Sequence, residues 1–271
     1  MSVAEVNGTT LFHEIVGTGP TCLVLHGGLG VDHTFYRSLD RLAHRLRLVY
    51  LDHRGNGRSG RPPPATITIE QLADDAAALG RIVADGPIVV LGHSYGGFVA
   101  QELVLRHQDQ VAGLILLDTT PGQLGLHEDP SADQGPPPPP DLAALLATAP
   151  ANDEELEATM RQLLAHYLHR ADPAVLEPLL DGTIFAADAC VRGFEVLASW
   201  SSVDRLPSIR CPTLVVVGRH DPVTSPPQSV RMASLIAGAD LAVLEHSGHM
   251  PWIDEPEQTF AVIEGWLDQI P

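Results

Sequence analysis

The segment VVLGHSYGGFVAQ at residues 89–101 constrains the fold more than any other part of this sequence. A run of branched apolar residues ends at Gly92, and a helix-like pattern begins at once after Gly96. Glycines at these two positions leave room where a very sharp turn would otherwise crowd its own side chains. The pattern predicts a strand, a tight turn and a helix, with Ser94 displayed at the turn.

Apolar strand-like segments alternate with amphipathic helix-like segments along most of the chain. Continuous apolar strands separated by helices are typical of an α/β fold with a mostly parallel sheet flanked by helices. Asn7-Gly8 supplies the positive φ of a tight turn and predicts a hairpin at the start. The expected strands are 3–6, 10–16, 22–25, 46–51, 88–91, 111–117, 213–217 and 241–244, and the expected helices between and after them are 35–43, 69–83, 97–107 and 257–270.

The alternation is interrupted between residues 121 and 206. A proline-rich stretch, SADQGPPPPPD at residues 131–141, comes first, and helical patterns such as 152–169 and 187–200 follow it. The five consecutive prolines favour an extended polyproline II connector, because proline cannot donate a sheet hydrogen bond. We therefore expect a core domain formed by residues 1–120 and 207–271, with a helical cap inserted at residues 121–206.

Composition excludes several classes of function. The formal net charge of −18, from 34 acidic and 16 basic side chains, disfavours binding to nucleic acid or to an anionic membrane surface. All 16 basic residues are arginine, so Schiff-base chemistry, pyridoxal phosphate, a Ser-Lys dyad and a Walker A loop are excluded. No apolar run approaches the roughly 18 residues of a membrane span, and no export signal is visible, so we expect a cytoplasmic protein.

Metal and disulfide chemistry are not expected either. The three cysteines, Cys22, Cys190 and Cys211, are widely spaced and fit neither a disulfide framework nor a zinc knuckle. The 13 histidines include no HxHxDH signature, although His166 and His169 fall about one helical turn apart. We expect no catalytic metal and no cofactor.

Ser94 lies in the pattern Gly-x-Ser-x-Gly between a strand and a helix, which is the setting of a nucleophile elbow. A serine hydroxyl is a poor nucleophile at neutral pH, so it needs an imidazole base and a carboxylate that orients the base. Asp221 and His249 follow the last two expected strands, and loops at the carboxyl ends of parallel strands converge on one edge. His246 is an alternative base and Asp118 an alternative acid, and a serine that merely caps the helix is the structural alternative.

These motifs resemble those of the α/β-hydrolase superfamily, and within it the group of proline iminopeptidases and N-acylhomoserine lactonases. LHGGLG, LDHRGNGRSG, GHSYGG, CPTLVVVGRHD and SGHMPWIDEPE occur in the order of that family, and they cover nearly the whole chain outside the cap. The resemblance favours His249 over His246 as base, and it implies an oxyanion hole at the backbone N–H groups of Gly28 and Tyr95. Proline iminopeptidases typically have HGGPG and GGSWGG, and this departure disfavours an aminopeptidase but leaves the serine hydrolase intact.

Supporting roles are expected for other polar residues of the motifs. His26, His53 and His93 are interpreted as structural residues that bond loop carbonyls around the crevice. Arg54, in DHRGNGRSG, is expected to pair with a carboxylate rather than to bind substrate.

The substrate depends on the cap, where the sequence is least informative. Apolar runs such as LAALLATA and RQLLAHYLH suit an acyl chain, and Glu195 is the candidate anchor for a substrate amine. We expect a carboxylesterase or lactonase that acts on a small molecule with an acyl or lactone group. The alternative is an aminopeptidase of the proline iminopeptidase type. The third hypothesis is a slow-turnover small-molecule receptor. Candidate substrate-binding residues are Leu29, Tyr167, Phe185, Glu195, Trp200 and Met250, although aromatic residues at helical spacing more often belong to a packed core.

Overall fold

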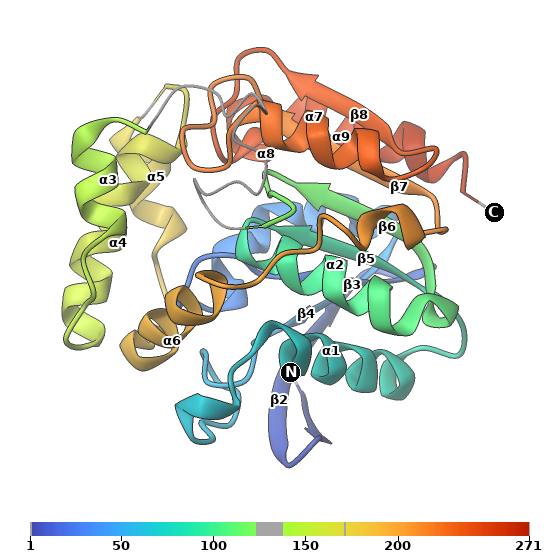
Figure 1. Cartoon of the computed structure of the whole chain (residues 1–271), viewed down its shortest axis with the longest axis horizontal. Coiled ribbons are helices and arrows are strands. Elements are labelled where there is room, and N and C mark those ends of the chain that lie inside the picture. The colour runs from blue at the N-terminus through green and yellow to red at the C-terminus, as the bar shows by residue number, and fades with distance from the viewer. Residues whose placement is uncertain (1, 123–137, 171, 271) are drawn as a thin grey trace.

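The computed structural model describes residues 2–122, 138–170 and 172–270, and its main element is one eight-stranded sheet (Figure 1). The strands are β1 (Ser2–Val6), β2 (Thr9–Val16), β3 (Thr21–Leu25), β4 (Arg47–Leu51), β5 (Ile88–His93), β6 (Val111–Leu117), β7 (Thr213–Gly218) and β8 (Asp240–Leu244). They are arranged in the order β1-β2-β4-β3-β5-β6-β7-β8. β1 and β2 pair antiparallel to their neighbours, and all the other pairs are parallel. The expected mostly parallel sheet and the opening hairpin are confirmed, with positive φ at Asn7 and Gly8 in the turn.

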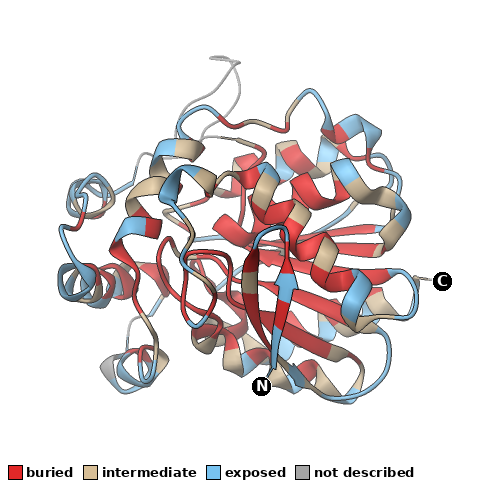
Figure 2. Ribbon diagram, turned by 90° about the horizontal axis from the view of Figure 1, so that it is seen from below, coloured by how far each residue is buried: buried red, intermediate tan, exposed pale blue. Residues whose placement is uncertain are grey.

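Helices cover both faces of this sheet. One set consists of α1 (Ile69–Val83), α2 (Tyr95–His107) and α7 (Pro226–Leu235). The other set consists of η1 (His33–His44), α8 (Pro251–Asp254) and α9 (Pro256–Leu267). The three helices of this second set contact one another. Short 3₁₀ turns are η2 (Pro64–Thr66), η3 (Gln108–Gln110) and η4 (Leu206–Ser208). Every residue of β5 and of β7 is buried, which explains why their sequences, IVVLGH and TLVVVG, are mostly apolar. Figure 2 shows that the strands inside the sheet consist mainly of buried residues.

Three of the core helices differ from the sequence prediction, and one of them is the short α8, which the sequence analysis did not include. The helix expected at 35–43 is a longer 3₁₀ helix, η1, because Asp32 caps it two residues earlier by accepting a hydrogen bond from the N–H of Thr34. The sequence analysis did not predict α7, which begins at two prolines. Proline is tolerated in the first turn of a helix, since the N–H that it lacks has no partner there.

Between β6 and β7, the part of the chain that the structure describes forms four α-helices, which we call the inserted helices. They are α3 (Pro140–Leu146), α4 (Asp153–Tyr167), α5 (Pro173–Leu179) and α6 (Ala187–Leu197). α3, α4 and α5 lie together beyond one edge of the core (Figure 1). Residues 131–137 of the proline-rich stretch are outside the described residues. At its end, Pro139 has the extended angles φ −50° and ψ 143°, whereas Pro140 already begins α3.

Among the described residues, no helix is both long enough and apolar enough to cross a membrane. Most of the large apolar side chains belong to one core that runs through the sheet and extends into the inserted helices. The inserted helices therefore share a hydrophobic interior with the sheet, and this interior includes the surroundings of Ser94.

Candidate active site

Ser94 connects the carboxyl end of β5 to the first turn of α2. Its backbone has φ 51° and ψ −118°, a conformation that a residue with a side chain rarely adopts. Hydrogen bonds hold it there: its N–H donates to Leu117 O (3.1 Å), and its carbonyl accepts from the hydroxyl of Thr119 (2.9 Å). A Cβ at Gly96 would lie 2.0 Å from Leu25 O, so only glycine lets α2 begin this close to β3. A strained residue held by its surroundings is typical of a functional position.

Asp221 and His249 form a buried pair in the loops that follow β7 and β8. The Nδ1 of His249 lies 2.9 Å from Oδ2 of Asp221, and the hydroxyl of Thr224 donates to the same oxygen at 2.5 Å. Oδ1 of Asp221 accepts from the N–H groups of Val223 (2.7 Å) and Thr224 (3.0 Å). Because the carboxylate faces Nδ1, the imidazole keeps its Nε2 available as a base.

The environment of Asp221 stabilises its ionised form. Burial alone would raise the pKa of this carboxyl, but the charge and hydrogen bond of His249 and the hydrogen bonds from Thr224 outweigh it. Together they lower the pKa of Asp221 to about 2. The carboxyl is therefore a carboxylate at neutral pH, and it favours an imidazole that donates from Nδ1.

His249 is held in contact with the residue that precedes Ser94. Its ring lies 4.7 Å from the ring of His93 and 4.9 Å from the ring of Tyr167, measured between centroids. The N–H of His249 also donates to Tyr167 O at 2.6 Å. The structure thus pairs His249 with Asp221 and places its ring against His93, the residue next to Ser94. His246 is exposed, and its N–H donates to Glu255.

His93 connects three loops around Ser94. The hydroxyl of Tyr36 accepts from the N–H of Gly27 and donates to Nδ1 of His93, both at 2.7 Å. Nε2 of His93 then donates to the carbonyl of His249 at 2.8 Å. Burial, together with the nearby His249, lowers the pKa of His93 well below its usual value, so this imidazole is neutral. No motif pointed to Tyr36, which lies in a segment predicted only to be a helix.

The other supporting residues behave as expected. Nδ1 of His26 lies 3.0 Å from Gly27 O, and Nε2 of His53 lies 3.3 Å from the carbonyl of His26. Arg54 is buried, and its guanidinium donates to both carboxylate oxygens of Asp75. The predictions that these histidines bond loop carbonyls and that Arg54 pairs with a carboxylate are confirmed.

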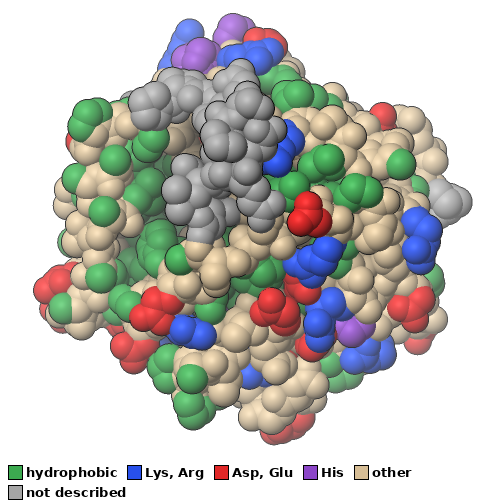
Figure 3. Space-filling model, viewed as in Figure 1, with side chains coloured by type: hydrophobic (Ala, Val, Ile, Leu, Met, Phe, Trp, Pro, Cys, Tyr) green, Lys and Arg blue, Asp and Glu red, His purple; other side chains and the backbone are tan. Residues whose placement is uncertain are grey.

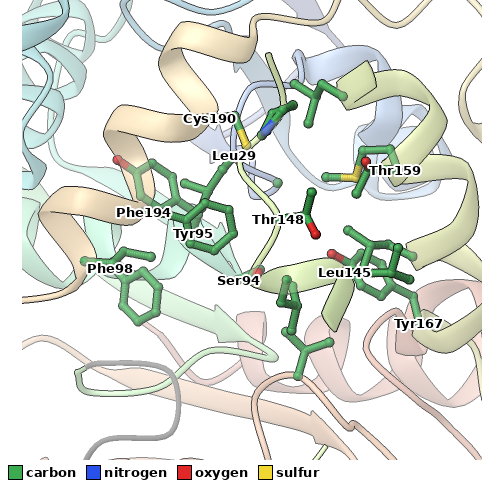
Figure 4. Close-up of a pocket in the computed structure, with 18 residues that line it drawn as sticks. Leu29, Ser94, Tyr95, Phe98, Leu145, Thr148, Thr159, Tyr167, Cys190 and Phe194 are labelled. Atoms are coloured by element: carbon green, nitrogen blue, oxygen red, sulfur yellow. The ribbon is translucent and has the colours of Figure 1, made fainter. Parts of the chain in front are cut away.

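An apolar cavity opens beside Ser94, between the core and the inserted helices (Figures 3 and 4). It encloses about 590 Å³ of empty space, part of it open to solvent. None of the described residues that line it is an Asp, Glu, Arg or His. The lining consists of Gly28, Leu29, Ser94, Tyr95, Phe98, Leu145, Leu146, Thr148, Pro150, Leu156, Thr159, Met160, Leu163, Tyr167, Cys190, Phe194, Leu197 and Val223. A cavity with this lining suits a small apolar group.

Four of the residues predicted around the substrate line this cavity together with Ser94. Gly28 and Leu29 come from the loop after β3, Tyr95 begins α2, and Tyr167 ends α4. Gly28 has φ +59°, which favours glycine, and its backbone can approach a ligand closely.

The other predicted substrate residues are absent from the lining. α6 turns Cys190, Phe194 and Leu197 towards the cavity, which leaves Glu195 on the outer side, where it accepts from Arg192 at 2.9 Å. The indole N–H of Trp200 donates to Glu102, on α2 (3.1 Å).

Phe185 and Met250 are also absent from the lining, because both are packed into the hydrophobic core. The carbonyl of Phe185 accepts a hydrogen bond from Arg61 at 3.3 Å. Met250 is fully buried at the start of α8.

Two clusters of metal-ligand types occur among the described residues, with ligand atoms within 4.8 Å of one another: Asp32, His33 and Asp52; and Asp118, Asp221 and His249. In the first, Asp32 accepts from Arg58 at 2.7 Å, and Nδ1 of His33 lies 2.5 Å from Asp52. In the second, the oxygens of Asp221 already accept from protein donors. Neither donor set fits a bound metal ion.

Comparison with known proteins agrees with this architecture. Residues 20–256 match the family described as alpha/beta hydrolase fold, and the chain belongs to this family of hydrolytic enzymes. Proline iminopeptidase PfmaB of Pestalotiopsis fici is 28% identical over 288 residues, which cover 98% of this chain and 98% of that protein. The expected fold class and the resemblance to proline iminopeptidases are therefore confirmed.

Two solved structures are similar over nearly their whole length. A thermophilic esterase from Thermogutta terrifontis has a TM-score of 0.76 and 27% identity, covering 98% of this chain and 96% of its own. Est816, described as an N-acyl homoserine lactone degrading enzyme, has a TM-score of 0.74 and 26% identity, covering 97% and 99%. The similar proteins therefore include an esterase, a lactone-degrading enzyme and a proline iminopeptidase.

Proposed function

We propose that this chain is a serine hydrolase that cleaves a carboxylic ester or a lactone through an acyl-enzyme on Ser94. The observation that carries the proposal is the position of Ser94, at a strained turn in the wall of a cavity whose described lining residues bear no charged side chain. The buried Asp221–His249 pair supplies the base that a serine nucleophile requires.

The proposed reaction has two halves. In acylation, Nε2 of His249 takes the proton of Ser94 Oγ while Oγ attacks the carbonyl carbon, and the N–H groups of Gly28 and Tyr95 stabilise the oxyanion. The carboxylate of Asp221 stabilises the imidazolium, which then gives its proton to the leaving alkoxide. In deacylation, His249 takes a proton from water as the water attacks the acyl carbon, and the carboxylic acid leaves as Ser94 is restored.

We further propose that the inserted helices form a substrate-binding cap at residues 121–206, over a core of residues 1–120 and 207–271. α3, α4 and α6 contribute most of the cavity lining, whereas the core contributes Ser94 and its neighbours. Such a division lets the helices select the substrate while the sheet fixes the reacting groups.

The cavity favours an ester or lactone over an aminopeptidase substrate. A buried ammonium group needs an anionic partner, and no carboxylate is found among the described lining residues. Glu195, the candidate anchor in the sequence, is exposed and paired with Arg192. The esterase and Est816 support this choice, whereas the name of PfmaB supports the alternative, a proline iminopeptidase.

A parallel assay tests the proposed function. Wild-type protein and Ser94→Ala are assayed with p-nitrophenyl acyl esters, N-acylhomoserine lactones of several chain lengths and proline-p-nitroanilide. We expect turnover of esters or lactones that Ser94→Ala abolishes, together with loss of covalent labelling by a fluorophosphonate. Activity should also fall at acidic pH, because the proposed reaction needs a neutral imidazole.

Three outcomes would contradict the proposal in different ways. Esterase activity that survives in a folded Ser94→Ala variant would remove Ser94 as the nucleophile. Cleavage of the anilide at about 10⁴ M⁻¹s⁻¹ with poor ester and lactone turnover would favour the aminopeptidase. About one event per molecule with a large ligand-induced stabilisation would favour a receptor.

A further inference from the structure

Asp118 is a fully buried carboxyl group that the proposed reaction does not use. It follows β6 directly and has φ +40°. Its Oδ1 accepts from the N–H of Gly218, at the end of β7 (2.9 Å). No donor among the described residues reaches its Oδ2. An unpaired carboxylate oxygen in a protein interior is costly, so this oxygen requires an explanation.

The nearest charged group to consider is Asp221. Ligand-type atoms of Asp118, Asp221 and His249 all lie within 4.8 Å of one another. Two carboxylates this close in a buried site cannot both ionise without a large cost, and such pairs hold one proton between them. A hydrogen bond between the two carboxyls would need that proton, because two carboxylates have only acceptors.

Hydrogen bonding decides which carboxyl holds the proton. The oxygens of Asp221 accept from four donors: the N–H groups of Val223 and Thr224, the hydroxyl of Thr224 and Nδ1 of His249. Those donors stabilise a carboxylate at Asp221. Asp118 has one donor, so a proton on its other oxygen completes its hydrogen bonding.

The titratable groups around Asp118 are Asp221 after β7, Asp254 in α8 and His249 after β8. The two carboxyl groups act in the same direction, whereas the hydrogen bond from the N–H of Gly218 opposes them. Burial and the negative charges of Asp221 and Asp254 raise the pKa of Asp118 well above its ordinary value. Neutral Asp118 beside ionised Asp221 is therefore the arrangement that both the contacts and the charges favour.

We propose that Asp118 is a neutral positioning residue, whose protonated carboxyl faces Asp221 and keeps the charge beside His249 at a single negative unit. A second negative charge there would stabilise the imidazolium relative to the neutral imidazole that the reaction requires. This effect on the base rests on the proposed function, but the protonation of Asp118 does not.

The pH dependence of kcat/KM tests the role in the reaction. Asp118→Asn keeps a donor and an acceptor without charge, whereas Asp118→Ala removes both. We expect the acid-side midpoint of Asp118→Asn to lie within about 0.3 pH unit of wild type, because no charge is lost. Asp118→Ala should lower kcat at least about tenfold with little change in KM, and Asn should restore most of that loss.

Other results would overturn this role. If Asp118 were ionised, Asp118→Asn would remove a negative charge near His249 and shift the acid-side midpoint about one unit towards lower pH. An Asn variant as impaired as Asp118→Ala, or an Ala variant as active as wild type, would also contradict it.

Unfolding free energy measured from pH 4 to 8 tests the protonation without any substrate. A pKa raised in the folded state means that the native protein holds more protons than the unfolded chain above the ordinary carboxyl pKa. The contribution of Asp118 to wild-type stability should then fall as pH rises through this window. The asparagine does not titrate, so the stability of Asp118→Asn relative to wild type should increase with pH. The exposed control Asp204→Asn should show no such rise.

A relative stability that stays flat or falls with rising pH would overturn the protonated state of Asp118. If the stability result holds while the protein hydrolyses no ester or lactone, the proposed function fails and the protonation stands. The two proposals are thus separated by experiment.

Discussion

The two sides of Ser94 differ in how they are held together. Towards the sheet, His93, Asp221 and His249 are buried and joined by hydrogen bonds with defined donors and acceptors. Towards the inserted helices, the cavity is lined almost entirely by aliphatic and aromatic side chains. Hydrogen bonds are directional and fail when one partner is removed, whereas apolar packing changes gradually with volume. Substitutions on the sheet side should therefore change the reaction, and those on the helix side should change the substrate range.

The largest expected effect tests the sheet side. Asp221→Asn removes the charge that stabilises the imidazolium and disturbs the orientation of His249. We expect kcat for p-nitrophenyl butyrate to fall by about 10³- to 10⁴-fold. The exposed Asp204→Asn is the matched control and should retain full activity. A loss below tenfold in Asp221→Asn would mean that the sheet side does not govern the reaction through this carboxylate.

A smaller effect is expected one step further from Ser94. His93→Phe leaves the hydroxyl of Tyr36 and the carbonyl of His249 without their partner, which should cost about 1–3 kcal/mol of unfolding free energy. Displacement of the three loops should lower kcat by about 10- to 100-fold. Denaturant titration and steady-state kinetics measure both quantities.

A double-mutant cycle with Tyr36→Phe provides the control. Both variants remove the hydrogen bond between Tyr36 and His93, so their effects on stability should be less than additive. If the two effects on unfolding free energy were strictly additive, Tyr36 and His93 would contribute to stability independently of each other.

The difference between the sheet side and the helix side of Ser94 also explains which features could be predicted from the sequence. Ser94, Asp221 and His249 could be found because each follows an apolar strand, and the ends of parallel strands meet at one edge. The contact of Tyr36 with His93 could not, because it joins residues 57 positions apart through side chains that carry no motif.

The side of α6 that faces the cavity could not be predicted from the sequence either. Phe194 faces the cavity while its neighbour Glu195 faces solvent, and Trp200 lies against α2. Aromatic residues at helical spacing reveal that a helix has a buried side. Whether that side meets a cavity or the core depends on how the helix rotates against its neighbours, which is decided by packing across the whole fold.

The next smaller effect is expected on the helix side of Ser94. Met160, in α4, lines the cavity, and Met160→Trp fills space that an acyl chain would occupy. We expect the ratio of kcat/KM for p-nitrophenyl octanoate to that for the acetate to fall about tenfold, because short acyl groups need less of the cavity. Gln162→Trp, on the exposed side of the same helix, is the control and should leave the ratio as in wild type. A uniform loss for all chain lengths would indicate damage to the reacting groups instead.

The smallest expected effect concerns the outer face of α6. Glu195 is 59% exposed and forms an i,i+3 ion pair with Arg192, and exposed pairs of this kind contribute little to stability. Glu195→Ala should therefore change kcat/KM for esters and lactones by less than about twofold, because the side chain lies outside the cavity and an exposed charge is screened by solvent. The measurement should include proline-p-nitroanilide. A large rise in KM for the anilide alone would show that Glu195 reaches a substrate ammonium, and the helix side would then bind charge as well as apolar groups.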